Sequence, residues 1–327
     1  MKAVVFDRIG PAREVLYLAD LPNPPVGDGE ALVRMVAAPV SPGDFLFIEN
    51  LYPEPKKPRF PQQIGGNHGL GVIEQVGRNV SLQPGQWVAF SYYNTWAEFA
   101  AVPAEWLIPL PAGFAVEKGA QLFNLITAWD LLNDSRVAAG GWLAVTAGYS
   151  AVATMVLQFA KQRGIRVVPI VRREYEHLDL RALGATEVID LSQSSETVHD
   201  RIQRVTQHHG IDGLVDNVGG PVTGELIRAL AFGGQVVING GMSPARFELH
   251  NFDILLKGVA IKAHVYRYFF KPPEVGDAEL LRQVVLASGR ADFMVPVGGV
   301  HSLEDFGSAL ERSMSDPSRG KRLLRMS

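Results

Sequence analysis

The chain has no cysteine among its 327 residues. This absence excludes disulfides, thiol nucleophiles, iron–sulfur clusters and every thiolate ligand for zinc. Histidine ligands are not favoured either, because His208 and His209 stand in a polar stretch before Gly210 and none of the eight histidines has a usual metal-site spacing. We therefore expect no bound metal ion.

Long apolar runs and an excess of one charge are also lacking. No run approaches the roughly 20 apolar residues of a membrane helix, and residues 1–6 have the pattern of a strand rather than a signal peptide. The formal net charge is −3 with 20% of the residues charged, so neither nucleic acid nor a membrane is expected as a partner. We expect a cytoplasmic protein that acts on a small-molecule substrate.

The chain changes character near residue 117, which predicts two domains, as its length also does. Residues 1–116 alternate short apolar runs with proline and glycine, a pattern typical of a mostly β domain. Further on, helical segments alternate with strands at 187–189, 213–217, 235–238 and 259–261. This order predicts an α/β fold with a doubly wound parallel sheet that binds its ligand outside the carboxyl ends of the strands. We expect residues 1–116 and 266–327 to form one domain and residues 117–265 an inserted second domain.

A strand at 141–147 turns sharply into a helix, and small residues stand at the turn. Gly148, Ser150 and Ala153 take the spacing G-x-G-x-x-G/A, in which small residues permit a tight turn, close approach of a pyrophosphate and close helix packing. Gly164 ends the helix, and residues 166–171 predict the next parallel strand. We expect the turn to bind a dinucleotide through Gly148, Tyr149, Ser150, Ala151 and Val152. The alternative is a βαβ unit that serves only as scaffold.

Arg172 and Arg173 follow this second strand, at the position where an NAD-selective fold carries an acidic residue for the ribose hydroxyl. A planar guanidinium can hold a 2′-phosphate through two hydrogen bonds and stays charged at any physiological pH. The pair therefore favours NADPH as cofactor. Two alternatives stay open: the arginines are simply solvated, or the adjacent Glu174 neutralises them or binds the ribose of NAD.

Short runs in a specific order extend the pattern over nearly the whole chain: 38–44, 65–69, 82–88, 124–128, 216–220 and 239–242. Through them the chain resembles the zinc-free branch of the medium-chain dehydrogenase/reductase superfamily, and within it the NADPH-dependent 2-enoyl thioester reductases and quinone oxidoreductases. The resemblance implies a GroES-like β domain, a Rossmann domain with the nicotinamide in the cleft between them, and a homodimer formed through the edge strand of the Rossmann sheet. Two departures stand out: the nucleotide turn has fewer glycines than usual, and His68 replaces a commonly acidic residue. Ser41 and Asn67 stand where zinc-dependent relatives have ligands.

The resemblance also implies roles for single residues. Lys321 would approach the adenosine phosphates, although a C-terminal basic run such as 319–322 is more often simply solvated. Asn67 and His68 would lie in the substrate cleft. His264 and Val265 replace aromatic residues of the family, and no role is transferred to them. The residues expected around the nicotinamide are Asn124 and Thr127 on one half and Gly240, Gly241 and Met242 on the carboxamide side.

Tyr52, in a proline-rich loop at 51–58, matches the tyrosine that enoyl thioester reductases use near the substrate carbonyl. Hydride delivery to the β-carbon of an activated alkene builds negative charge on the carbonyl oxygen. A phenol with an ordinary pKa near 10 stays protonated at neutral pH and can donate to that oxygen. The alternative is a tyrosine whose ring packs on a proline.

The sequence therefore predicts an NADPH-dependent reductase of activated carbon–carbon double bonds in enoyl thioesters, enones or enals. In this hypothesis Tyr52 is the oxyanion or proton donor. One alternative is an NADPH:quinone oxidoreductase, because those enzymes also carry a tyrosine near this position. Another is a non-catalytic NADPH-binding protein like the lens crystallins, which the substituted glycines and His68 favour. A zinc alcohol dehydrogenase is a weaker alternative, since the sequence has no thiolate.

Overall fold

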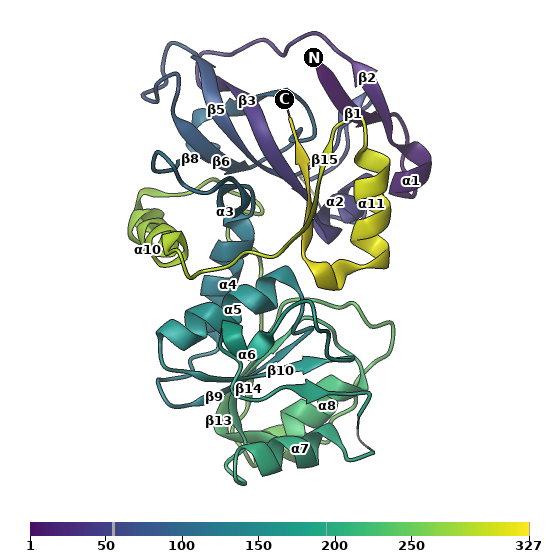
Figure 1. The fold of residues 1–327 in the computed structure, drawn as a ribbon, viewed down its shortest axis with the longest axis vertical. Coiled ribbons are helices and arrows are strands. Elements are labelled where there is room, and N and C mark those ends of the chain that lie inside the picture. Colours follow the sequence, from purple (N-terminus) through teal and green to yellow (C-terminus); the bar gives the residue numbers. More distant parts are fainter. Residues whose placement is uncertain (54–55, 194, 327) are drawn as a thin grey trace. The chain divides into compact units, whose positions relative to one another are not determined.

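The computed structural model describes residues 1–53, 56–193 and 195–326. The chain forms two compact units: unit 1 consists of Met1–Leu125 and Arg267–Ser327, and unit 2 of Ile126–Tyr266. Both ends of the chain, purple and yellow in Figure 1, belong to unit 1. The sequence pattern puts the boundaries at 116/117 and 265/266. The first structural boundary falls inside α4 (Leu122–Asp134), because the preceding α3 (Val116–Ala120) packs on strands of unit 1.

Unit 1 is mostly β, as the sequence predicts. Its strands are β1 (Lys2–Phe6), β2 (Tyr17–Asp20), β3 (Glu30–Val40), β4 (Gln63–Ile64), β5 (His68–Val76), β6 (Trp87–Ser91), β7 (Phe99–Pro103), β8 (Leu107–Pro109), β15 (Val297–Ser302) and β16 (Lys321–Arg325). The larger sheet has the order β15-β16-β3-β5-β6-β8, with β7 also paired to β3, and a smaller sheet has the order β2-β1-β4. The C-terminal β16 pairs antiparallel with β3, so the end of the chain is built into the sheet that begins near residue 30.

Aromatic side chains fill the core of unit 1. Phe6, Phe47, Phe90 and Trp96 are fully buried, and burying one such side chain contributes roughly 1.5–3 kcal/mol. The rings of Phe6 and Phe47 meet edge to face with centroids 6.1 Å apart. This contact holds α2 (Pro42–Ile48) on β1 and so fixes the start of the loop that carries Tyr52. Besides α2, α3 and the start of α4, the helices of unit 1 are α1 (Ala12–Val15), α10 (Ala278–Gly289) and α11 (Phe306–Ser315).

Unit 2 is the doubly wound parallel sheet that the sequence predicts. Its strands are β9 (Trp142–Thr146), β10 (Arg166–Val171), β11 (Ile189–Asp190), β12 (Ile211–Asp216), β13 (Leu230–Ile238) and β14 (Ala260–Ala263). They pair in parallel in the order β11-β10-β9-β12-β13-β14. The order reverses beside β9, where open sheets of this kind bind their ligands.

Helices cover both faces of this sheet. They are α5 (Ala151–Gln162), α6 (Leu180–Leu183), α7 (Val198–Val205), α8 (Pro221–Arg228) and α9 (Asn251–Leu255). Figure 1 shows α5 and α6 on one side of the sheet and α7 and α8 on the other. Because both faces are covered, β9 is buried along its whole length. The helix and strand predicted after the nucleotide turn are α5 and β10, and Gly164 follows α5 with a positive φ of 68°.

The structure also locates the proline-rich loop around Tyr52 and the pair of neighbouring histidines. Residues 51–53 and 56–58 of the proline-rich loop contain neither helix nor strand, while Glu54 and Pro55 lie outside the described residues. His208 lies in the turn that follows α7, where its φ is positive at 65°.

The described ranges contain no group of three or more His, Asp and Glu side chains that could hold a metal ion. None of the helices in those ranges is both long and apolar enough to cross a bilayer.

Candidate functional site

The turn after β9 lies close against the neighbouring strand. Gly148 donates its N–H to the carbonyl of Ile170 at 3.1 Å. A Cβ at Gly148 would lie 2.7 Å from Cβ of Pro169 and 2.8 Å from Cγ1 of Val171, closer than packed carbon atoms approach. Packing against β10 therefore requires glycine at the first position of the predicted fingerprint.

Ser150 caps α5. Its Oγ accepts a hydrogen bond from the N–H of Ala153 at 3.2 Å, so the helix begins with Ala151 and Val152. The first N–H groups of a helix have no partner within it, and the macrodipole is positive there. This end of α5 therefore fits a phosphate group.

Tyr149 is used inside unit 2. Its hydroxyl donates to the carbonyl of Tyr175 at 3.2 Å and accepts from the N–H of Tyr175 at 2.9 Å. The two rings also meet edge to face, with centroids 5.0 Å apart. The side chain of Tyr149 thus fastens the nucleotide turn to the loop after β10.

Arg172 and Arg173 are exposed just beyond β10. The guanidinium of Arg173 lies 4.8 Å from the ring centroid of Tyr175. The carboxylate of Glu174 is bound by Arg181 at 2.8 Å. Because Glu174 is paired elsewhere, the two arginines present positive charge beyond β10, which fits a 2′-phosphate.

A buried aspartate organises the carboxyl ends of β9 and β12. Oδ1 of Asp216 accepts a hydrogen bond from Oγ1 of Thr146 at 2.8 Å, and Oδ2 accepts one from Oγ1 of Thr223 at 2.9 Å. The N–H groups of Val218 and Gly219 donate to the same carboxylate at 3.1–3.2 Å. Sequence reasoning assigns no role to Asp216; the available signal is an aspartate directly after the apolar pair Leu214 and Val215 at the end of the strand.

The segment after β13 is held against the end of β12. Nδ2 of Asn239 donates to Oδ1 of Asn217 at 2.7 Å. A Cβ at Gly240 would lie 2.4 Å from the carbonyl oxygen of Asn217, so glycine is required there. Gly241 and Met242 follow, and Met242 is exposed. The predicted carboxamide-side residues therefore share the carboxyl edge of the sheet with the nucleotide turn.

The predicted residues of unit 1 gather around Asp44, which sequence reasoning missed. Its carboxylate is buried and accepts hydrogen bonds from the N–H of Ser41 at 2.8 Å, the N–H of Asn67 at 2.9 Å and Nδ2 of Asn67 at 2.8 Å. Burial raises the pKa of Asp44 to about 6, against the lowering effect of these hydrogen bonds and of Lys321. Asn67 therefore serves to fix Asp44.

Tyr52 is half-buried beside the first turn of α2. A Cβ on Gly43 would lie 2.5 Å from the Tyr52 hydroxyl oxygen, so the phenol occupies space that only glycine leaves open. Its ring meets that of Phe269 edge to face, with centroids 4.8 Å apart. Burial, and secondly the charge of Asp44, raise the pKa of Tyr52 above its ordinary value. The ring therefore has an aromatic partner far along the chain.

His68 and Lys321 complete this group. The ring of His68 stacks on Phe123 at 5.1 Å. Burial, with the charges of Lys56 and Lys321, lowers its pKa to about 3, so the imidazole is neutral at physiological pH. Burial also lowers the pKa of Lys321 to about 8, opposed by Asp44.

The two nicotinamide residues predicted on α4 fall in different units. Asn124 belongs to unit 1, where its Nδ2 donates to Oε1 of Gln121 at 3.4 Å. Thr127 belongs to unit 2 and is half-buried. Each unit thus presents its own group of predicted site residues.

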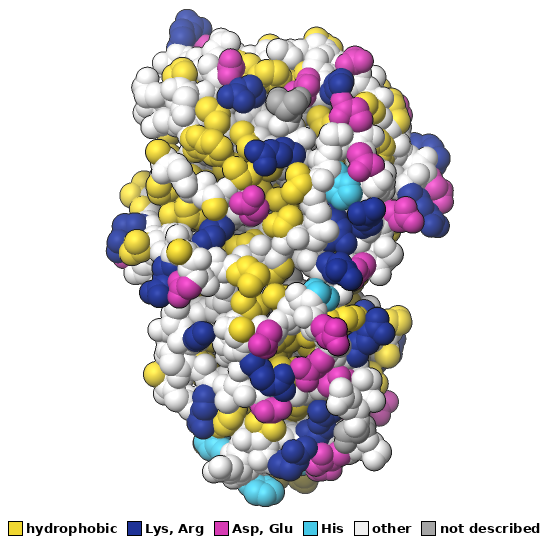
Figure 2. Space-filling view, in the orientation of Figure 1, with side chains coloured by type: hydrophobic (Ala, Val, Ile, Leu, Met, Phe, Trp, Pro, Cys, Tyr) yellow, Lys and Arg dark blue, Asp and Glu magenta, His cyan; other side chains and the backbone are white. Residues whose placement is uncertain are grey.

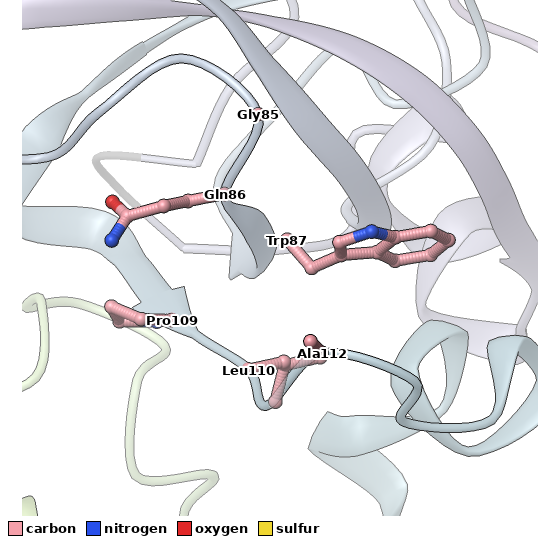
Figure 3. Close-up of a pocket in the computed structure, with 6 residues that line it drawn as sticks. All are labelled: Gly85, Gln86, Trp87, Pro109, Leu110 and Ala112. Atoms are coloured by element: carbon pink, nitrogen blue, oxygen red, sulfur yellow. The ribbon is translucent and has the colours of Figure 1, made fainter.

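A shallow pocket of about 290 Å³ lies elsewhere on unit 1 (Figure 3). It is lined by Gly85, Gln86, Trp87, Pro109, Leu110 and Ala112. None of these residues is predicted to bind cofactor or substrate.

Figure 2 shows basic and acidic side chains interspersed over the visible face, in keeping with the small net charge.

Comparisons with known proteins identify relatives of this chain. A family model described as "Alcohol dehydrogenase GroES-like domain" matches residues 27–112, and one described as "Zinc-binding dehydrogenase" matches residues 151–280. The mitochondrial enoyl-[acyl-carrier-protein] reductase of Homo sapiens is 30% identical, over 100% of this chain and 89% of that protein. The enzyme of the same name from Xenopus tropicalis is 29% identical, over 99% of this chain and 95% of that protein.

Solved structures share the fold over almost the full length. The complex of Etr1p with NADP and crotonyl-CoA has a TM-score of 0.85 at 23% identity and covers 99% of both chains. A quinone oxidoreductase from Pseudomonas syringae pv. Tomato has a TM-score of 0.84 at 24% identity and the same coverage. The chain belongs to the zinc-free, enoyl reductase branch of the medium-chain dehydrogenase/reductase superfamily, and it is an oxidoreductase. The predicted family and fold class are therefore confirmed.

Replacing Gly148 by alanine tests the packing of the turn. The added methyl group would meet Pro169 and Val171 at less than 3 Å, so we expect a loss of about 1–3 kcal/mol in the free energy of unfolding. Thermal denaturation would measure it. Gly241→Ala is the matched control, because nothing lies within 4 Å of a Cβ there. Equal stability of the two variants would contradict the packing constraint.

Proposed function

We propose that the protein reduces activated carbon–carbon double bonds, with enoyl thioesters, enones or enals as substrates. The observation that carries the proposal is the half-buried phenol of Tyr52, set beside Gly43 and kept protonated by its surroundings. NADPH supplies the hydride when it is bound. The mitochondrial relatives are named as enoyl-[acyl-carrier-protein] reductases, which favours an enoyl thioester.

Tyr52 is the proposed donor to the substrate oxygen. A donor aimed at a developing oxyanion acts strongly because the charge appears only as the reaction proceeds. The raised pKa of Tyr52 keeps its proton in place at neutral pH. His68 cannot take this role as a cation, because its pKa is lowered to about 3. The phenol is therefore the proposed source of a hydrogen bond or proton at the carbonyl oxygen or α-carbon.

The carboxyl edge of the sheet in unit 2 is the proposed cofactor site. The N-terminal end of α5, with Gly148, Tyr149, Ser150, Ala151 and Val152, would bind the pyrophosphate through backbone N–H groups. Arg172 and Arg173 would bind the 2′-phosphate. The remaining proposed contacts are Asn124, Thr127, Gly240, Gly241 and Met242 for the nicotinamide and Lys321 for the adenosine phosphates.

We also propose a homodimer formed through unit 2. Strand β14 ends the parallel sheet, and all its residues are exposed. Ile261 on this strand has exposed apolar neighbours in sequence, Leu255 and Leu256. An uncovered edge strand with apolar side chains favours pairing with a second copy. A Candida tropicalis structure with this fold is an Etr1p/Etr2p heterodimer. The compartment stays a prediction, because the relatives above are mitochondrial by name.

Tyr52→Phe tests the proposed donor. We expect kcat for an enoyl thioester to fall about 100-fold, because only the developing oxyanion loses its hydrogen bond. The Kd of NADPH, measured by fluorescence, should stay within about twofold. Steady-state kinetics on crotonyl-CoA and on a benzoquinone, followed by NADPH absorbance, supply the comparison.

The substrate panel separates the alternatives. Turnover of quinones without enoyl thioesters would replace the proposed reaction by quinone reduction. Tight NADPH binding without turnover of either substrate would favour a non-catalytic protein. Unchanged kcat in Tyr52→Phe would remove the tyrosine from the mechanism.

The double variant Arg172→Ala, Arg173→Ala tests recognition of the 2′-phosphate. Loss of charge-assisted hydrogen bonds should raise the Kd of NADPH about 100-fold, while the Kd of NADH changes less than about threefold. Calorimetry measures both. Arg204→Ala on α7, which breaks a pair with Glu196, is the control and should change neither. Equal weakening of the two cofactors would argue against phosphate recognition.

Ile261→Asp tests the dimer. A charge on the edge strand should convert the dimer to a monomer, which light scattering after gel filtration would detect. Leu286→Asp on α10 of unit 1, a more exposed apolar position, should leave the mass unchanged. A wild-type protein that is monomeric at micromolar concentration would overturn the proposal.

A further inference from the structure

Lys56 is an unusual lysine because its side chain is buried, with only 4% of the residue exposed. Its ammonium lies 4.8 Å from the ring centroid of Phe269 and 5.6 Å from that of Tyr93. A cation held between aromatic faces is attracted by the ring quadrupoles, and more strongly when water is excluded. The side chain is therefore held by its charge as well as by packing.

Phe269 is the same ring that supports Tyr52. The Tyr52 ring meets the Phe269 ring edge to face, with centroids 4.8 Å apart and planes at 80°. Tyr93, the other ring beside Lys56, packs against Phe47 of the core with centroids 5.6 Å apart. A continuous row of contacts therefore runs from the core through Tyr93, Lys56 and Phe269 to Tyr52.

We propose that Lys56 is a positioning residue for Tyr52: its ammonium holds the Phe269 ring in place, and the ring fixes the direction of the phenol. The inference rests on the proposed function, because the phenol needs a fixed direction if it donates to a developing oxyanion. Sequence reasoning treats residues 51–58 only as a proline-rich loop around Tyr52. The long-range contact with Phe269 gives a second residue of that loop a role.

The charge of Lys56 is itself sensitive to pH. Burial lowers its pKa to about 8, opposed by the charge of Asp44. The ammonium is therefore present at neutral pH and is lost as the pH rises through about 8. The titratable groups that contact it or exchange charge effects with it are Asp44 of α2, His68 of β5 and Tyr93 after β6. Tyr52 is linked to it through Phe269, and Lys321 of β16 acts on the same Asp44 and His68.

The test is Lys56→Met, which keeps the length of the side chain and removes its charge. We expect kcat for crotonyl-CoA at pH 7 to fall about tenfold with an unchanged Kd of NADPH. In the wild type kcat should also fall as the pH rises through about 8, and this alkaline limb should disappear in Lys56→Met. Lys56→Arg, whose guanidinium also binds aromatic faces, should restore kcat and move the limb to higher pH.

Two further variants separate charge from packing. Lys57→Met changes the neighbouring lysine, whose Nζ donates to the carbonyl of Asn50 at 3.3 Å, and it should keep both kcat and the alkaline limb. Phe269→Leu should lower kcat like Lys56→Met, and the double variant Lys56→Met, Phe269→Leu should be no slower than either single variant. Losses of kcat that add up in the double variant would overturn the proposal. An alkaline limb that persists in Lys56→Met would also overturn it, because the limb would then belong to Lys321.

A measurement without turnover distinguishes failure of this inference from failure of the proposed function. In protein labelled with ¹³C at the lysine ε-carbon, the NMR signal missing from Lys56→Met should titrate near pH 8 and should shift in Phe269→Leu. If wild-type protein turns over no alkene yet this signal behaves as expected, the reaction is wrong and the contact stands. If the enzyme is active and Lys56→Met equals the wild type, the inference alone fails.

Discussion

The buried carboxylate of Asp216 is the interaction on which the functional end of unit 2 depends. It lies at the end of β12 and accepts hydrogen bonds from the hydroxyls of Thr146 and Thr223 and from backbone N–H groups that follow the strand. The hydroxyl of Thr146 receives its own hydrogen bond from the N–H of Asn217 at 2.7 Å. Removing this carboxylate would leave several buried donors unpaired, and each unpaired group costs about 1–3 kcal/mol. The ends of β9 and β12, where the nucleotide turn begins, are thereby fixed together.

Unit 1 also has a buried carboxylate, that of Asp44, which joins two segments of the chain and in addition acts on the charged groups around it. Asp44 also accepts hydrogen bonds from backbone and amide donors, which join α2 to the segment before β5. Its surroundings differ, because its charge acts on Tyr52, Lys56 and Lys321. One carboxylate among two buried ammonium groups leaves a site with excess positive charge while both lysines are protonated. Such a site is suited to a reaction in which negative charge develops on a substrate oxygen.

The fold could be predicted from the sequence where the signal was local. The period of apolar residues and the glycines around 148–164 predict β9, α5 and β10 because those elements are specified by neighbours in sequence. The burial of Lys56 could not be predicted in this way, since its partner Phe269 lies in a distant segment of the chain. The same holds for Tyr149, whose pattern suggests a ligand contact while its hydroxyl binds the backbone of Tyr175. Tertiary contacts decide what a polar side chain does, and a single sequence does not contain them.

The expected free-energy contributions rank the proposed roles of Tyr52 and Lys56 at the reacting oxygen. A hydrogen bond that strengthens only in the transition state contributes about 2.7–4 kcal/mol, whereas a buried cation–π contact contributes about 2 kcal/mol and acts here through a second ring. Tyr52 must therefore outweigh Lys56 if both act on the same step. Because Lys56 works by fixing Tyr52, its contribution has to vanish once the phenol is absent. The two effects are consequently nested rather than additive, which distinguishes a positioning residue from an independent source of positive charge.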